Sequence, residues 1–347
     1  MVDILPLDKF DQKSLNRRNF YSIGFKFNKQ TNKTYITAMK NKLLAAMAIF
    51  GMVASASAVK INNNLSINGF IDGSYKLVDN STGADDQGLD ADEAELNFVL
   101  TNGAVSGLLS IDSARVRTDD LNIEQAHFTY DLGNGVSVTF GRYGSALGFE
   151  REDPAGLYTF SRAYSTSAAN IGNIDNGNVV EGATVAYSAD QFSVAASFEN
   201  GRGADLESDD LNLELSFSYT GIADMVIGGG YFFDNKQVNA DEADTMNIHA
   251  SRSFGKLLVA AEYTEISTDA LDRDAYMVLA DYDYTDKIGV ALRISKEELD
   301  ASNDYEKITI APNYSITDNL GAIIEFSDVE SSGADSNELA VELTYTF

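Results

Sequence analysis

The chain has 347 residues, with 25 Lys and Arg against 53 Asp and Glu, and a formal net charge of −28. Such an acidic balance argues against nucleic acid as a partner, because binding to phosphates depends on basic side chains. Cysteine is absent, which excludes disulfides and thiolate metal sites. No apolar stretch after residue 58 approaches the roughly 18 residues of a transmembrane helix.

Residues 39–58 have the pattern of a secretory signal peptide. A pair of lysines precedes an apolar run from Leu43 to Val53, and Ala56 and Ala58 form a small-residue cleavage site. The run is about half as long as a membrane-spanning helix, so a retained anchor is the less favoured alternative. We expect cleavage after Ala58. Residues 1–38 are then an upstream extension from a mis-assigned start codon, and a long two-part leader is the alternative.

The charge balance changes at this boundary. Residues 1–58 hold nine of the 25 basic residues and three of the 53 acidic ones, so residues 59–347 carry 50 acidic and 16 basic side chains, a formal net charge of −34. We expect residues 59–347 to form one domain that is stabilised by its fold alone.

Alternation of apolar and polar residues dominates residues 59–347. Between Leu211 and Tyr219 every second residue is Leu, Phe or Tyr, and a period of two indicates a β-strand. The pattern predicts an all-β fold with about 16 strands, whose ends are uncertain by about two to four residues. The expected strands cover residues 65–77, 91–101, 104–114, 122–132, 136–143, 179–188, 191–200, 209–219, 225–234, 245–254, 257–267, 274–284, 288–298, 304–314, 320–329 and 337–347.

The connections between these strands alternate between short turns and longer acidic loops, which is typical of a bacterial outer-membrane barrel. An even number of strands places both termini on the periplasmic side with the short turns. A soluble sandwich, the alternative, gives no reason for such sorting. The turns are expected at Asn102-Gly103, Gly133-Asn134-Gly135, Ala189-Asp190, Gly221 to Asp224, Gly255-Lys256, Thr285 to Lys287 and Thr317 to Asn319.

Outward-facing aromatic residues are expected at two heights along the strands. Tyr187, Phe254 and Tyr345 lie near the short turns, whereas Tyr263 and Phe326 lie near the long loops. We interpret them as interfacial girdles around an apolar band. Aromatic side chains that simply filled a core would not be sorted by height.

The connection of residues 144–178 is the longest, and a loop of this length needs a functional reason. The preceding run Phe140-Gly141-Arg142-Tyr143-Gly144 resembles the strand end that leads into the constriction loop of general diffusion porins. Gly148-Phe149-Glu150 and Ser161-Arg162-Ala163-Tyr164 resemble segments of OmpL-like β-barrel porins. Tyr345-Thr346-Phe347 is similar to the terminal signature that the barrel assembly machinery reads in outer-membrane proteins.

This resemblance implies an outer-membrane porin, forming a homotrimer, that lets small hydrophilic solutes diffuse through a water-filled channel. It also implies that the third long loop folds into the barrel and narrows it. Acids of the loop would then face bases of the wall or loop across the opening. The acids are Glu150, Glu152 and Asp153, and the bases are Arg142, Arg162 and Arg293. Arg142 falls on the outward face by alternation unless Gly141 forms a bulge.

Acidic residues dominate the inward positions of the predicted strands. Because a low-dielectric wall concentrates counter-ions, we expect the channel to prefer cations. The inward acids are Asp72, Glu95, Asp112, Glu199, Glu214, Glu262, Asp281 and Glu325.

Acidic runs in the expected loops offer oxygen ligands to calcium or magnesium, which would bridge the loops to lipopolysaccharide. The spacing of a dedicated calcium loop is missing, so plain solvated charge is the favoured interpretation, and no metal or cofactor is expected. The runs are Asp85-Asp86, Asp205 to Asp210, Asp241 to Asp244 and Glu297-Glu298.

Two other functions were weighed against a channel. An outer-membrane hydrolase would need a catalytic group, but the two histidines, His127 and His249, lie in different strands and in no catalytic motif. We therefore expect no enzymatic activity. A closed barrel that acts as a structural or adhesive platform is less favoured, because such platforms use about eight strands whereas about 16 leave an aqueous channel.

Overall fold

The protein is a closed antiparallel β-barrel without helices in its described residues. The computed structural model describes residues 58–113, 121–150, 156–164, 179–200, 211–235, 243–268, 272–299, 304–331 and 333–347. The expected leader, Ala56 included, therefore lies outside the described residues, and Ala58 is the first residue inside them. No helix in the described part of the chain has the length and hydropathy that crossing a membrane requires.

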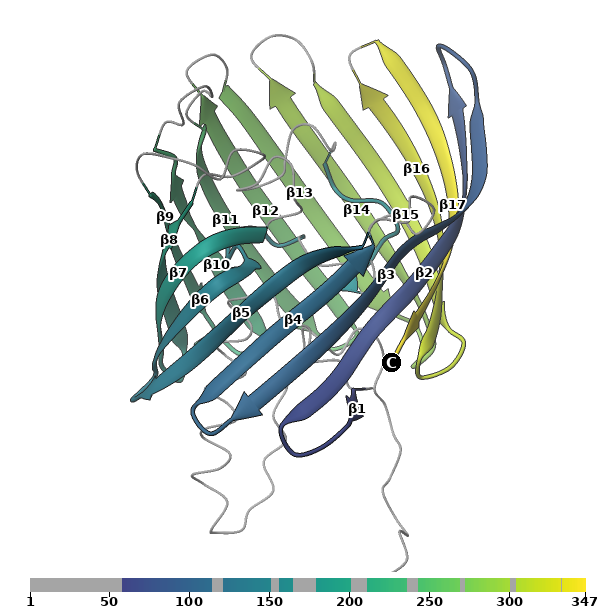
Figure 1. Ribbon diagram of the computed structural model, residues 1–347. Coiled ribbons are helices and arrows are strands. Elements are labelled where there is room, and N and C mark those ends of the chain that lie inside the picture. The colour runs from purple at the N-terminus through teal and green to yellow at the C-terminus, as the bar shows by residue number, and fades with distance from the viewer. Residues whose placement is uncertain are drawn as a thin grey trace, which may run out of the picture.

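The strands follow one another around the barrel in sequence order (Figure 1). They are β1 (Val59–Lys60), β2 (Leu65–Asn80), β3 (Asp86–Asn102), β4 (Val105–Ser113), β5 (Asn122–Gly133), β6 (Val136–Gly144), β7 (Val179–Ser188), β8 (Phe192–Glu199), β9 (Asn212–Tyr219), β10 (Met225–Phe233), β11 (Ala243–Phe254), β12 (Leu257–Thr268), β13 (Asp272–Asp283), β14 (Ile288–Leu299), β15 (Tyr305–Ser315), β16 (Leu320–Ser331) and β17 (Ala334–Thr346).

The barrel is closed by pairing of the last strand, β17, with the first long strand, β2. β17 pairs with β2 in an unbroken antiparallel register from Asn80 to Phe70. Phe347 extends this ladder, because its backbone exchanges two hydrogen bonds of 3.0 Å with Gly69. The short β1 pairs with the following residues of β2, with Val59 opposite Ile67. The 16 strands from β2 to β17 therefore form a barrel without an open edge, as predicted.

The predicted turns are confirmed on one side of the barrel. Gly133, Asn134 and Gly135 join β5 to β6 with φ values of +83°, +54° and +85°, a left-handed backbone that Gly and Asn adopt readily. β1, the C-terminal end and the turns lie together at the lower end of Figure 1. The sequence therefore located this end of the barrel by its turn residues.

The opposite end differs from the prediction because several strands extend further. Asp86 and Asp244 belong to strands and not to acidic loops, whereas Glu297 and Glu298 lie in β14, inside the expected strand of residues 288–298. The alternation of apolar and polar residues stops before these strands end, because charged and polar residues occupy both faces there. The run Asp205 to Asp210 and residues Asp241 and Glu242 lie outside the described residues.

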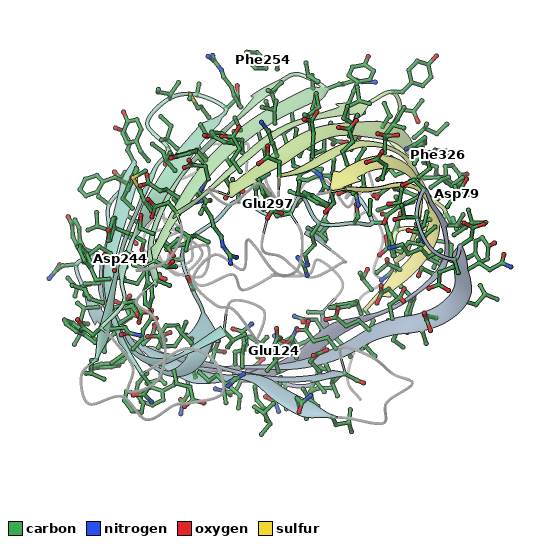
Figure 2. The ribbon with its side chains drawn as sticks, turned by 90° about the horizontal axis from the view of Figure 1, so that it is seen from above. Asp79, Glu124, Asp244, Phe254, Glu297 and Phe326 are labelled. Atoms are coloured by element: carbon green, nitrogen blue, oxygen red, sulfur yellow. The ribbon has the colours of Figure 1, made fainter. Side chains whose placement is uncertain are left out.

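Two faces alternate along each strand. On β13 the side chains of Ala275, Met277, Leu279 and Asp281 are buried, whereas Tyr276 between them is exposed. Large apolar side chains remain exposed on the outward face all round the barrel. Phe254 and Phe326 point away from the lumen, while Glu124 and Glu297 point into it (Figure 2). An outward apolar surface of this kind suits contact with lipid.

Candidate functional site

The connection between β6 and β7 enters the barrel. Its described residues form two segments, which we call the first limb (residues 145–150) and the second limb (residues 156–164). Both limbs contact inward-facing side chains of strands far away in the sequence. Both limbs therefore lie against the inner wall of the barrel, and the narrowing of the lumen by residues 144–178 stays a prediction.

A buried tyrosine lies at the end of β6, immediately before the loop. Tyr143 is buried at the end of β6, and its hydroxyl bonds to Ser197 and Thr184 at 2.8 Å each. Gly141, with φ of +130°, and Gly182 stand opposite each other in the β6–β7 register. A Cβ on Gly141 would lie 2.3 Å from the carbonyl oxygen of Ala126. Only glycine fits there.

Wall carboxylates on β9 and β12 hold the first limb. Glu214 accepts a hydrogen bond from the Ser145 hydroxyl and one of 2.8 Å from the backbone N–H of Ala146. Further along, Glu262 accepts a hydrogen bond from the backbone N–H of Phe149. These are charge-assisted hydrogen bonds that help to satisfy the buried carboxylates, and Glu262 also accepts one from Asn247 at 2.9 Å.

Neighbouring contacts fix the same limb. The N–H of Gly148 donates to the side-chain oxygen of Asn247 at 3.1 Å, and Leu147 packs fully buried against Phe232. The second limb meets the same carboxylate, because the Tyr164 hydroxyl donates to Glu262 at 3.4 Å. Burial and the charge of Glu262 raise the pKa of Tyr164, so this phenol remains a donor at neutral pH.

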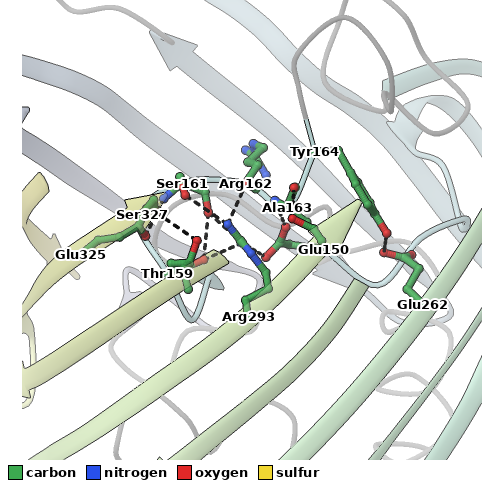
Figure 3. Close-up of polar contacts among 12 residues, drawn as sticks. Glu150, Thr159, Ser161, Arg162, Ala163, Tyr164, Glu262, Arg293, Glu325 and Ser327 are labelled. Atoms are coloured by element: carbon green, nitrogen blue, oxygen red, sulfur yellow. Dashed lines mark hydrogen bonds and ion pairs between the residues drawn. The ribbon is translucent and has the colours of Figure 1, made fainter. Parts of the chain in front are cut away.

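Arg293 of β14 organises the second limb. Its guanidinium donates to Glu150, to the Thr159 hydroxyl, to both oxygens of Ser161 and to the carbonyl of Arg162 at 2.5 to 3.1 Å. These contacts surround the guanidinium in Figure 3. A planar group with five N–H donors can hold several loop oxygens at once, which a lysine ammonium cannot do.

Further wall groups complete the seat of the second limb. Glu325 of β16 accepts a 3.0 Å hydrogen bond from the N–H of Ser161, and the Ser295 hydroxyl bonds to the carbonyl of Ala163. Below them an apolar cluster joins the limb to the wall. It consists of Tyr158 and Ala163 of the limb with Ala260, Met277, Leu279, Ala291, Ala311 and Ile323 of the wall.

Glu150 connects the two limbs to each other and to the wall. One carboxylate oxygen forms an ion pair of 2.5 Å with Arg293, and the other accepts a hydrogen bond from the N–H of Ala163. The side chains of Glu150 and Arg293 are 4% and 0% exposed. The two opposite charges neutralise each other in direct contact and do not lie on opposite sides of an opening.

The structure separates the other predicted constriction residues. Arg142 stays in alternation with Phe140, since the β6 register continues without a bulge at Gly141. Its side chain forms an ion pair of 3.4 Å with Glu181 of β7 and donates to the carbonyl of Glu124. Arg142 therefore lies on the outward face and does not join the Glu150 cluster.

The remaining members differ in position. Arg162 is exposed, and its carbonyl, not its guanidinium, meets Arg293. In Figure 3 its side chain points away from Glu150. Glu152 and Asp153 lie outside the described residues, so their place at the opening stays a prediction.

The wall of β2 to β5 carries a second group of acids. Asp72, Glu95 and Asp112 face the lumen with exposed fractions of 3, 5 and 8%. Glu95 stands directly opposite Asp112 in the β3–β4 register. Lys76 is the one Lys or Arg among the described residues of β2 to β5, and it pairs with Glu338 of β17 at 3.4 Å.

Glu124 belongs to this group although alternation places it outward with Ala126. A β-bulge skips it, because Ser110 pairs with Gln125 and the next residue of β4, Ile111, pairs with Ile123. The Ser110 hydroxyl lies 3.2 Å from Glu95 and 3.3 Å from Glu124. One extra residue in β5 thus turns a carboxylate towards the lumen.

The buried charges of the described residues are mostly acidic. They comprise ten carboxylates and two cations, Arg293 and Lys307. The predicted lumen acids Glu199, Glu214, Glu262, Asp281 and Glu325 are all among them, together with the three on the β2 to β5 wall. Within the part of the chain that the structure describes, no group of three His, Cys, Asp or Glu side chains is arranged to hold a metal ion.

The histidines occupy separate places on the lumen wall. His127 of β5 is buried with its ring edge-on to Tyr143 at 6.2 Å. His249 of β11 contacts the side-chain oxygen of Asn247 at 3.1 Å, and its ring lies 6.0 Å from Phe149. His127 therefore packs against the end of β6, and His249 packs against the first limb.

The comparisons with known proteins agree with this architecture. The family described as "beta-barrel porin-2, OmpL-like" matches residues 78–342. None of the curated proteins matches the chain. The solved structures of similar fold include the anion-selective porin from Comamonas acidovorans, with 13% identity and a TM-score of 0.62 over 82% of this chain and 99% of that one.

Two further structures resemble the barrel to the same degree. OmpF of Salmonella typhi, solved in complex with daunomycin, has 14% identity and a TM-score of 0.63 over 84% of this chain and 100% of its own. The outer-membrane channel DcaP of Acinetobacter baumannii has 15% identity and a TM-score of 0.61 over 86% and 100%. At these identities the likeness concerns the fold alone.

Proposed function

Because the chain belongs to the OmpL-like β-barrel porin family and is thereby a multi-pass protein of the outer membrane, we propose that its water-filled channel passes small hydrophilic solutes by passive diffusion and prefers cations. The path that we propose runs between the inward loop and the wall of β2 to β5. It excludes large solutes by width and anions by charge.

The observation that carries this proposal is the excess of acids on the inward face of the described strands, where ten carboxylates and two cations are buried. On the β9 to β16 side, Glu214, Glu262 and Glu325 bond to the loop. On the other side, Asp72, Glu95 and Asp112 are buried at inward positions, and a β-bulge turns Glu124 towards the lumen. Negative charge along one wall of a low-dielectric channel raises the local concentration of cations.

The proposal includes the partners that the sequence implies. They are lipopolysaccharide and other outer-membrane lipids around the barrel, the barrel assembly machinery acting on Tyr345 and Phe347, and two further copies in a homotrimer. The acidic outer end offers oxygen ligands to divalent cations there. It includes no catalysis: His127 and His249 lie on strands that do not pair and each is packed against an aromatic ring.

Planar-bilayer recordings of the protein purified from outer membranes test the proposal. We expect discrete conductance steps and, across a potassium chloride gradient, a zero-current potential with the sign of cation preference. The absence of steps would favour a closed platform. A potential of the opposite sign would contradict the cation preference, and hydrolysis of detergent-solubilised phospholipid would restore the enzyme hypothesis.

A further inference from the structure

We infer that Glu150 and Arg293 are positioning residues that fasten the loop to the wall and thereby set the width of the channel, and that they do not supply opposite charges to a field across it. This inference rests on the proposed function. It differs from the expectation that the resemblance gave, in which acids of the loop and bases of the wall face each other across water.

The first argument concerns charge. The oxygen of Glu150 and the nitrogen of Arg293 lie 2.5 Å apart, and both side chains are almost completely buried. Two opposite charges in contact act at a distance as a small dipole, whose potential falls off faster than that of a single charge. A solute on the β2 to β5 side therefore meets little net charge from this pair.

The second argument concerns the number of bonds. Arg293 donates five hydrogen bonds, and four of them go to Thr159, Ser161 and Arg162 of the second limb. The acceptors of these four are neutral hydroxyls and carbonyls, which carry no net charge into a field. Four hydrogen bonds from the two terminal nitrogens to neutral acceptors hold the course of the backbone.

The third argument concerns the two oxygens of Glu150. One accepts from Arg293 and the other from the N–H of Ala163, so the carboxylate joins β14 to both limbs. A glutamine has the same shape but only one acceptor oxygen, and its amide group would meet a second donor. The first limb keeps its bonds to Glu214 and Glu262, so Glu150→Gln should loosen the connection of the first limb to the second limb and to β14.

Three substitutions test the inference in single-channel recordings, with Glu95→Gln as the matched control on the opposite wall. We expect Glu150→Gln, Arg293→Gln and Arg293→Lys each to make conductance fluctuations about ten-fold more frequent, the factor that the loss of one charge-assisted hydrogen bond corresponds to. Their mean conductance should rise, and the zero-current potential of Arg293→Lys, which keeps both charges of the pair, should stay near that of the wild type. Glu95→Gln should move the potential and leave the conductance steady.

Arg293→Lys separates the two roles, because lysine keeps the charge and loses the fork of donors. If Arg293 acted by its charge alone, Arg293→Lys would leave the conductance unchanged. If Arg293 positions the loop, this substitution should alter the conductance. The double variant Glu150→Gln with Arg293→Gln should fluctuate no more than Arg293→Gln alone, since Arg293→Gln already breaks the connection to Glu150.

Steady conductance, combined with opposite shifts of the zero-current potential for Glu150→Gln and Arg293→Gln, would overturn the inference. If Arg293→Gln does not fold, Glu150→Gln and Arg293→Lys decide. A wild-type protein without conductance steps would instead disprove the proposed function.

Discussion

Two sides of the same lumen carry carboxylates at inward positions, and they use them differently. On β9, β12 and β16 the acids Glu214, Glu262 and Glu325 accept hydrogen bonds from the loop. On β3 and β4 Glu95 and Asp112 face each other directly, and the Ser110 hydroxyl lies 3.2 Å from Glu95. An inward acid thus holds the loop or bonds within the wall, depending on which donors come within reach. Its own strand does not decide this.

The largest effect should follow from breaking the anchored side. Arg293→Ala leaves the carboxylate of Glu150 buried without its cation, and loss of one partner from a buried ion pair costs about 3–5 kcal/mol. Urea unfolding of the protein in lipid vesicles measures this change in the free energy of unfolding. A loss below about 1 kcal/mol, the range of exposed pairs, would show that the cluster is hydrated and weak.

A change on the open side should affect selectivity and spare stability. Glu95→Gln with Asp112→Asn removes two neighbouring like charges, so the fold should be unchanged or slightly more stable. A unit charge about 4 Å from an ion in water contributes about 1 kcal/mol, so the cation to anion permeability ratio should fall about five-fold. An unchanged ratio in zero-current measurements would mean that ions do not pass along this wall.

The smallest effect belongs to a single contact at the edge of the anchored side. Tyr164→Phe removes the 3.4 Å hydrogen bond to Glu262 and should cost about 0.5 kcal/mol. Because burial and Glu262 raise the pKa of Tyr164 above its ordinary 10.0, the unfolded phenol ionises first as pH rises. Wild-type stability should then fall more steeply above pH 10.0 than that of Tyr164→Phe. Parallel pH profiles in urea unfolding would contradict this.

The sequence predicts those features of the fold that depend on residues close together in the chain. Period-two alternation located the 16 strands, and turn residues such as Gly133 and Asn134 located one end of the barrel. Alternation also identified Glu95 and Arg293 as inward. The sequence places Asp86 and Asp244 in loops, although they lie in strands, because charged residues at strand ends give no alternation.

What the sequence could not predict depends on contacts between distant segments. The path of the loop brings the N–H of Phe149 to Glu262 and Glu150 to Arg293, and no local pattern contains that information. The bulge at Glu124 also escaped prediction, because an extra residue in one strand is visible only against the register of its neighbour. Arg142 was placed by resemblance against its own alternation, and the alternation was right.

That bulge has a consequence for how such barrels diversify. Glu124 reached the lumen through one additional residue in β5, while its neighbours Ile123 and Gln125 kept their faces. Insertion or deletion of a single codon within a strand can therefore alter the ionic preference of a channel without replacing any amino acid. Relatives aligned column by column would show such events only as gaps.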